Sequence, residues 1–456
     1  MRRVVKVSRI RIIITIIVVV LTTLLTGCTG KEPNEIAYVV ALGIDSTDDD
    51  NYKITIQYAN TTQISGGASE SGGKAGSEIV DNVTIEAPNI YAGVGLANNI
   101  VSKSFSMSHA KLIVFSKEIA EKGVKDMIET LVRSEEIRPD VFIAVANTTA
   151  NDYLTSVNPE MEVNPAQYYQ LIYQKNQLVG IPDGQLREFF TGLYTDNYDS
   201  ILPVAGVIEG AGGNSQNDDK GQSKDSQNEG SEGSSESLDS FESKSSNEKD
   251  ENEKEKDAEK NTSKYEYDIK NYVGGETAIE KKNKAEAIGA AVFEKDKMVG
   301  ELGEVETEIC KMLKGDYTYS YLTYYNNDTP DIPITVKTTQ QKKPKYKIDT
   351  DKKTVDIELY IESDLYSLPA DYNVENKIED FERDVANYTS SACTEFINNF
   401  TKKYNSDILK LNEKVKYKFL TNNQYNWFKK NVGWSKYKFS VCTNFKVRRT
   451  GLIVRK

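Results

Sequence analysis

The chain has 456 residues, a formal net charge of −12 at pH 7 and a single histidine. Its length is sufficient for two or three domains, each with its own core. An acidic chain lacks the lysine- and arginine-rich surface that phosphate backbones require, so we expect no nucleic-acid partner. A single histidine also argues against histidine-based metal sites and against Ser–His catalytic triads.

The N-terminus has the pattern of a bacterial secretion signal. Five basic residues and no acidic residue precede position 28, and residues 12–25 form an apolar run interrupted only by threonines. The run ends in the letters LTGC, which resemble the lipobox where signal peptidase II cuts before a cysteine that receives diacylglycerol. We predict a signal peptide at 1–27 and lipidation of Cys28, with an uncleaved helical anchor as the alternative. Either form places the remaining chain outside the cytoplasm, attached to the membrane.

After the leader, short segments of alternating apolar residues are typical of strands, and longer segments have helical spacing. The first helix, at 88–101, has a proline in its first turn, and the second, at 117–133, is amphipathic. Two shorter helices are expected near 165–177 and 183–190. This order predicts mixed α/β layers with a partly parallel sheet. The strands are expected at 36–44, 52–58, 83–87, 111–115 and 141–146.

Residues 209–263 differ from the rest of the chain in composition. They contain 16 acidic and 7 basic residues, and their only large apolar side chains are Leu238 and Phe241. Such a segment buries too little apolar surface to offset the entropy of ordering, so we predict a disordered acidic linker or insertion. Binding of cations or of a basic partner is the alternative role. The predicted domains, 28–208 and 264–456, lie on either side of this linker.

The C-terminal part begins with a predicted hairpin, with strands at 287–293 and 298–302 around a Lys-Asp turn. From 374 to 411, apolar residues recur every three or four positions, which predicts one long amphipathic helix. We expect this helix to pack over the preceding sheet, and a coiled-coil seam is the alternative. The whole protein is predicted to be α+β or mixed α/β, with mixed β-sheets flanked by helices. Further strands are expected at 318–324, 333–339, 345–348, 354–361 and 438–448.

No motif for catalysis or cofactor binding is complete. His109 directly precedes an apolar strand and is expected to be structural. Gly93 and Gly95 only half resemble a dinucleotide-binding loop, because the third glycine is missing. Asp45 and the acidic residues 48–50 could hold a cation, but a polar turn between two strands explains them better. The sequence therefore predicts no enzyme, no cofactor and no metal site.

The cysteines and tryptophans are also expected to be structural. Trp427 and Trp434 could form a sugar-binding platform, although packing in a core or interface is the expected role. An odd number of widely spaced cysteines after the anchor does not indicate a disulfide framework. We expect three buried free thiols, with one bridge as the alternative, at Cys310, Cys393 and Cys442.

Several stretches behind the lipobox carry a family resemblance. They are NEIAYVVALGID at 34–45, SHAKLIVF at 108–115, RSEEIR at 133–138, and GAAVF with KDKMVG at 289–300, followed by Glu306-Thr307. In this order they resemble the Ger(x)C family, the lipoprotein C subunits of spore germinant receptors in endospore-forming Firmicutes. The resemblance extends over both halves of the chain. Two departures are the sequence KEP, where the family has a tryptophan near the anchor, and the long acidic insertion.

The resemblance implies a non-enzymatic receptor subunit on the outer leaflet of the spore inner membrane. Its implied partners are a membrane-embedded A subunit and a transporter-like B subunit, whose nutrient binding would be coupled to ion and dipicolinate release. A short tether to the anchor holds the next residues near the bilayer, where membrane partners are concentrated. The alternative is an extracytoplasmic solute-binding or adhesin-like lipoprotein. The expected partner contacts are Lys31, Glu32, Pro33, Asn34 and Glu35.

Overall fold

The computed structural model describes most of the chain outside the leader and the acidic segment. The predicted linker at 209–263 lies outside the described residues, so its predicted disorder stays a prediction. The described residues are 13–18, 35–49, 51–59, 80–158, 162, 164–174, 180–195, 197–208, 271–277, 283–326, 329–368, 377–404 and 406–450.

The first of two mixed sheets has nine strands, in the order β3-β2-β1-β5-β6-β7-β8-β9, with β4 paired to β1. Its centre is parallel from β1 through β5 and β6 to β7, as the sequence predicted. The flanking pairs, β1–β2, β2–β3, β7–β8 and β8–β9, are antiparallel. The first seven strands are β1 (Ile36–Ser46), β2 (Tyr52–Ala59), β3 (Val80–Ala87), β4 (Ser104–Ser106), β5 (Leu112–Ser116), β6 (Phe142–Ala146) and β7 (Ile201–Val207).

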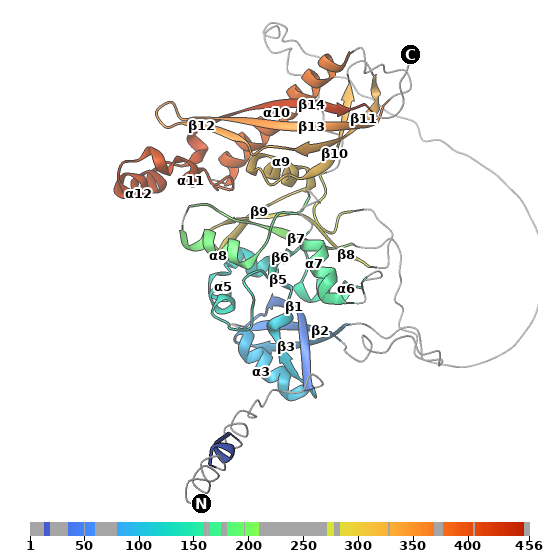
Figure 1. The fold of residues 1–456 in the computed structure, drawn as a ribbon, viewed down its shortest axis with the longest axis vertical. Coiled ribbons are helices and arrows are strands. Elements are labelled where there is room, and N and C mark those ends of the chain that lie inside the picture. Colours follow the sequence, from blue (N-terminus) through green and yellow to red (C-terminus); the bar gives the residue numbers. More distant parts are fainter. Residues whose placement is uncertain are drawn as a thin grey trace, which may run out of the picture. The chain divides into compact units, whose positions relative to one another are not determined.

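Helices cover both faces of this sheet because its central strands are apolar on both sides. β5 and β6 are buried along their whole length, as expected for parallel strands between two helical layers. Helices α3, α4, α5 and α8 pack into the core on one face, and α6 and α7 into the core on the other (Figure 1). These helices are α3 (Ile90–Ile100), α4 (Lys117–Lys122), α5 (Lys125–Val132), α6 (Ala150–Ser156), α7 (Pro165–Tyr173) and α8 (Leu186–Thr195).

The prediction of a single helix at 117–133 is wrong, because the structure has two helices there, α4 and α5. Gly123 ends α4 with a φ of +125°, a conformation that L side chains rarely adopt. The next amide, that of Val124, donates a hydrogen bond of 3.0 Å to the carbonyl of Asp296 in the β8–β9 turn. Apolar spacing did not reveal the break because both helices contribute to the same core.

Segments from both sides of the predicted linker share the first sheet. β7 precedes residue 209 and pairs antiparallel with β8 (Ala285–Glu294), which follows the linker. β8 then forms the predicted hairpin with β9 (Lys297–Leu302). The C-terminal segment of the chain therefore contributes strands to both sheets.

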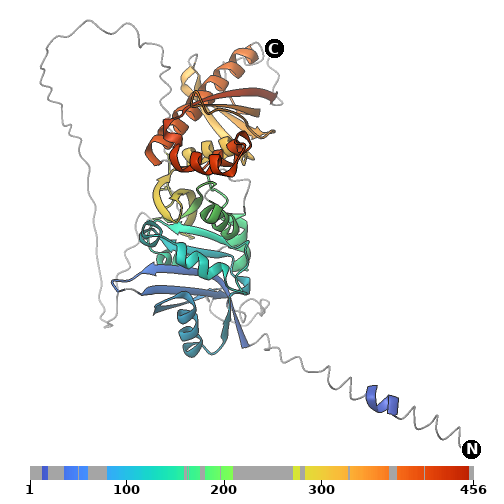
Figure 2. The ribbon, with the colours of Figure 1, turned by 90° about the vertical axis from the view of Figure 1, so that its left-hand side faces the viewer.

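The second sheet has five strands, in the order β10-β11-β13-β12, with β14 parallel to β13. Figure 2 shows the long helix α10 (Ile378–Tyr404) running along this sheet, where its apolar side shares a core with β13 and β14. The predicted packing over a sheet is therefore confirmed, although the helix ends at Tyr404 and not at 411. The strands and the unpredicted helix α9 are β10 (Tyr319–Asn326), β11 (Thr329–Gln340), β12 (Lys345–Asp349), β13 (Thr354–Ser367), β14 (Lys438–Arg449) and α9 (Glu304–Lys314).

The three cysteines that the structure describes, on α9, α10 and β14, are free thiols. Cys310 and Cys393 are buried, as predicted. The prediction is wrong for Cys442, which is exposed because alternate residues of β14 face away from the core. Within the described residues, none of the helices combines the length and apolarity needed to cross a membrane.

Candidate functional site

The predicted lipidation and contact residues lie at the edge of what the structure describes. Cys28 and the residues Lys31, Glu32, Pro33 and Asn34 fall outside the described residues. Glu35 is exposed and directly precedes β1. The assignments of a lipid anchor and of partner contacts here therefore remain predictions.

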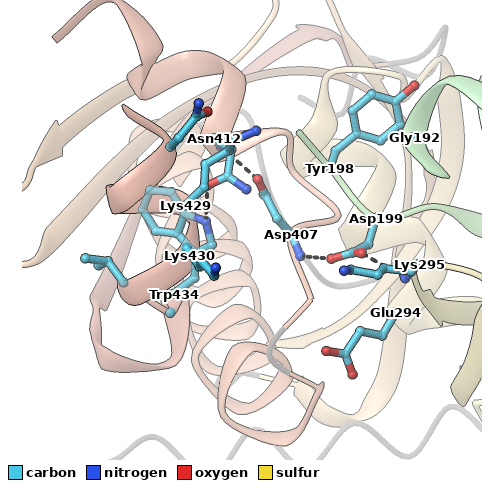
Figure 3. Close-up of a pocket in the computed structure, with 13 residues that line it drawn as sticks. Gly192, Tyr198, Asp199, Glu294, Lys295, Asp407, Asn412, Lys429, Lys430 and Trp434 are labelled. Atoms are coloured by element: carbon cyan, nitrogen blue, oxygen red, sulfur yellow. Dashed lines mark hydrogen bonds between the residues drawn. The ribbon is translucent and has the colours of Figure 1, made fainter. Parts of the chain in front are cut away.

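A cleft of about 600 Å³ brings together three segments that are far apart in the sequence. They are the chain from α8 to β7, the β8–β9 turn, and residues 407–434, which contain α11 (Leu411–Val415) and α12 (Asn422–Asn431). Figure 3 shows carboxylates, lysines and an indole ring from these segments around the cleft. The lining residues are Gly192, Tyr198, Asp199, Glu294, Lys295, Asp407, Asn412, Asn426, Lys429, Lys430, Val432, Gly433 and Trp434.

Two aspartates join the three segments. The Asp199 carboxylate accepts hydrogen bonds from the amides of Asp407, at 2.8 Å, and Lys295, at 3.1 Å (Figure 3). The Asp199 amide in turn donates to the Asp407 carbonyl at 3.1 Å. The Asp407 carboxylate accepts from the amides of Leu411 and Asn412, both at 2.8 Å, and so satisfies the first free amides of α11.

Asp407 has an unusual protonation equilibrium because it is buried. Only 4% of its surface is exposed. Burial raises the pKa of the Asp407 carboxyl to about 7, since a charged carboxylate loses its hydration there. The amides of Asn412 and Leu411 oppose this shift, and the nearby Asp199 carboxylate adds to it. Asp407 therefore changes charge near neutral pH, at the junction of the three segments.

Lysines hold the C-terminal helical segment against the loop before β7. The Lys410 ammonium forms an ion pair with Glu188 and lies 4.1 Å from the centroid of the Tyr198 ring. Lys429 donates to the Asn197 side chain at 3.3 Å and lies 5.0 Å from the centroid of the Tyr425 ring. The Lys410–Tyr198 contact joins two segments, and a cation–aromatic contact of this kind contributes about 0.5–2 kcal/mol, whereas Lys429 and Tyr425 both belong to α12. The contacts of Lys410 and the Lys429–Asn197 hydrogen bond therefore hold the segments that line the cleft together.

The two tryptophans have different environments. Trp434 is buried, and its indole Nε1 donates to the Asn412 side chain at 3.1 Å, so it packs in the core as expected. Trp427 on α12 is 64% exposed. The two indoles therefore do not share a buried environment.

The cleft presents charged and polar groups to any molecule that enters it. Its two central carboxylates, those of Asp199 and Asp407, each accept two backbone hydrogen bonds, which fix their orientation. Among the described residues, no group of three or more His, Cys, Asp or Glu side chains is placed to hold a metal. Positively charged lysines and negatively charged carboxylates both line the cleft. Such a lining suits a small polar solute or a peptide segment.

The candidate residues from the sequence, Asp45 and His109, make contacts within the fold. Asp45 is buried at the end of β1, and its carboxylate accepts from the amides of Ala150, at 2.6 Å, and Asn151, at 3.0 Å, at the start of α6. It is therefore a helix-capping residue, whereas Asp48 and Asp49 lie in the expected turn. His109 contacts Tyr38 edge-on, with ring centroids 4.8 Å apart.

Sequence reasoning did not identify Asp199 or Asp407. The position of Asp407 four residues before Leu411 is a weak helix-start signal, since aspartate is favoured near the first turn of a helix. Asp199 carries no local signal, because its partners Lys295 and Asp407 are 96 and 208 residues away.

Comparisons with known proteins assign the chain to a family. The family described as "Spore germination protein N-terminal domain" matches residues 30–207. The family described as "Spore germination B3/ GerAC like, C-terminal" matches residues 288–451. The two matches lie on either side of the predicted acidic linker.

Individual relatives carry related names. Spore germination protein KC of Bacillus subtilis is 26% identical over 35% of this chain and 42% of its own length. Spore germination protein B3 of the same organism is 26% identical over 30% of this chain and 36% of its own length. The matched region thus spans less than half of each relative. The crystal structure of the GerBC protein aligns with a TM-score of 0.47 and 15% identity, over 89% of this chain and 96% of that chain. The two family matches cover both halves of the chain, and this protein therefore belongs to the GerAC-like family of spore germination proteins.

Proposed function

We propose that this protein is the lipid-anchored C subunit of a spore nutrient germinant receptor. The observation that carries the proposal is the family match over both halves of the chain, directly behind a lipobox-like sequence that ends in Cys28. In this function the body acts outside the cytoplasm through contacts with partners and without catalytic turnover. The cleft of about 600 Å³, which lysines and carboxylates line, supports a binding role.

The proposed partners are a membrane-embedded A subunit and a transporter-like B subunit. The proposed contact region is the tether after the anchor, which includes Lys31, Glu32 and Glu35. We expect the protein to co-purify with both subunits from detergent-treated spore membranes. Reversing the charges of these three residues should weaken that co-purification and leave lipidation intact. Lys125→Glu, at an exposed position on α5, is the matched control.

Spores that lack this protein test the function itself. We expect them to lose the response to one nutrient and to germinate normally with triggers that bypass nutrient receptors. A normal response to every nutrient, in a strain without a second copy of this family, would contradict the proposal.

A solute-binding lipoprotein is the second candidate function, and the 600 Å³ cleft is the observation that favours it. A ligand that binds only the folded state stabilises it by RT ln(1 + L/Kd), where L is the free ligand concentration, so the melting temperature rises as L exceeds Kd. A shift in melting temperature of the isolated body with one nutrient, lost in Lys429→Glu, would favour solute binding over subunit assembly.

A further inference from the structure

One segment has a charge opposite to that of the whole protein. Residues 410–438 contain eight lysines and a single acidic residue, Glu413, whereas the chain as a whole carries a net charge of −12. Several of these lysines are directed into contacts, as Lys410 is with Glu188. Five others are exposed: Lys416, Lys418, Lys430, Lys436 and Lys438. Of these, Lys418 also donates to the Ile348 carbonyl, and the Lys416 ammonium lies 5.8 Å from the centroid of the Tyr425 ring.

The same segment exposes large apolar side chains. Leu420 is 94% exposed, the highest value for a large apolar residue in the described part of the chain, and Tyr417 is 80% exposed. Both border a surface depression of about 430 Å³, together with Lys416 and Phe419. Trp427, a short distance along the chain on α12, is 64% exposed. Burial of one such side chain contributes about 1.5–3 kcal/mol, so leaving several in water is unfavourable.

These side chains are exposed although the segment itself is folded. Its inner residues Leu411, Val415, Tyr425 and Phe428 are buried in the core that also contains α10 and β14. The Thr421 hydroxyl caps the start of α12 by accepting from the Gln424 amide at 3.3 Å. The apolar side chains outside this core therefore belong to a folded segment, whose helices α11 and α12 are labelled in Figure 1.

We propose that the exposed side chains of this segment, among them Lys416, Tyr417, Leu420, Trp427 and Lys430, bind an anionic lipid bilayer. Exposed lysines are attracted to anionic headgroups, and tyrosine and tryptophan favour the boundary between headgroups and acyl chains. Leucine inserts into the acyl region beneath them. Acidic groups on a protein partner would match the lysines alone, whereas a bilayer also takes up the exposed leucine and aromatic side chains. This contact is separate from the proposed Cys28 anchor and does not depend on it.

Vesicle binding by the chain that starts at residue 29 tests this proposal without the lipid anchor. All three major cores begin after residue 36, so this shortened chain keeps every core residue. We expect it to sediment with vesicles that contain phosphatidylglycerol and not with vesicles of phosphatidylcholine alone. Added salt should reduce the binding, because salt screens exposed charges. The fluorescence of Trp427 should shift to the blue on binding, while Trp434 gives a constant background because it is already buried.

Substitutions in the surface distinguish it from general adsorption. Lys416→Glu and Lys430→Glu should each lower the partition coefficient at least about fivefold, and Leu420→Ser about tenfold. Lys125→Glu and Ile100→Ser, at exposed positions outside the segment, are the matched controls and should bind as the unsubstituted chain does. Absence of binding to anionic vesicles, or equal losses in the controls, would overturn the proposal. Loss of Cys28 lipidation would leave this result unchanged, so the proposed anchor is tested separately.

Discussion

Buried carboxylates are the most distinctive single residues of this protein. Asp45 and Asp407 each accept two amide hydrogen bonds at the start of a helix, which offsets part of the cost of burying a charge. Burial still raises the pKa of both carboxyls. The pKa of Asp407 is raised to about 7. Glu308 on α9 has a pKa raised to about 7 as well, again mainly by burial.

The raised pKa of Asp407 predicts a specific dependence of stability on pH. Its folded-state pKa of about 7 lies above 3.8, the ordinary value for an aspartate, so the folded state binds the proton more tightly than the unfolded state does. The linked stability is complete below about pH 4 and is lost as the pH rises through about 7, at about 1.4 kcal/mol for each pKa unit. The melting temperature of the unsubstituted protein should therefore fall as the pH is raised from 5 to 8. For Asp407→Asn, which has no carboxyl to titrate, we expect this fall to be smaller by about 3–6 °C.

Glu308→Gln serves as the internal comparison for this experiment. This substitution should also reduce the dependence of the melting temperature on pH over the same range. Its effect should be independent of that of Asp407→Asn, because Glu308 is in a separate environment beside Tyr317. Equal pH profiles for Asp407→Asn and the unsubstituted protein, measured by thermal unfolding, would show that Asp407 does not titrate in this range.

Cys28 provides a second prediction for a single residue. Lipidation requires its thiol, so Cys28→Ala should release the protein from membranes or accumulate the uncleaved precursor. Cys442→Ala removes an exposed thiol from β14 and should leave membrane attachment unchanged. Membrane fractionation and mass spectrometry of the mature N-terminus make the measurement. A diacyl-modified mature form of Cys28→Ala would refute the assignment.

Among the elements, α3 shows how close packing explains a sequence that resembles a nucleotide-binding motif. Gly93 and Gly95 lie inside this helix and not in a loop. A Cβ on Gly93 would lie 2.6 Å from Cδ1 of the buried Ile54, whereas nothing lies within 4 Å of a Cβ on Gly95. Only Gly93 is therefore required for contact between α3 and β2.

These two glycines form a matched pair of substitutions. Gly95→Ala should raise stability by about 0.5–1 kcal/mol, because alanine restricts the unfolded chain and favours the helix. Gly93→Ala should lower it by about 1–3 kcal/mol, since the added methyl overpacks the core against Ile54. Denaturant unfolding of both variants makes the measurement. Equal effects of the two changes would show that the contact of α3 with β2 relaxes easily.

At the scale of the whole molecule, two strands on either side of the predicted linker hold the chain together. β7 and β8 pair antiparallel from Ile201↔Val292 to Val207↔Ala285, although more than 70 residues separate the two strands. The Asp199–Asp407 contacts add a second connection between distant segments. Both connections use residues outside the acidic segment.

Removal of the acidic segment should therefore leave the fold intact. Deletion of residues 212–260 removes almost no large apolar side chains, and shortening a loop changes its closure entropy only slowly. We expect the melting temperature to change by less than about 2 °C. Replacement of the segment by a Gly/Ser sequence of equal length separates the effect of composition from that of length. A fall of more than about 5 °C on deletion, corresponding to roughly 1 kcal/mol or more, would indicate that the segment packs against the body.

Local patterns in the sequence determined the element types and the family. The apolar run of β1, the β8–β9 hairpin and the helical spacing of α10 were all predictable, because each depends on residues within a few positions of one another. The ordered motifs likewise indicated the GerAC-like family, which the matches to both halves confirm.

The tertiary structure alone decided which distant residues meet. The division of α4 from α5 depends on the Asp296 carbonyl, more than 170 residues away, and the exposure of Cys442 depends on which face of β14 the long helix covers. Asp199 and Asp407 form a hydrogen-bonded pair because the loop before β7 packs against the C-terminal helical segment, a contact that no local pattern in the sequence indicates. Spacing along a chain records the periodicity of one element, whereas burial and hydrogen-bond partners depend on how separate elements pack.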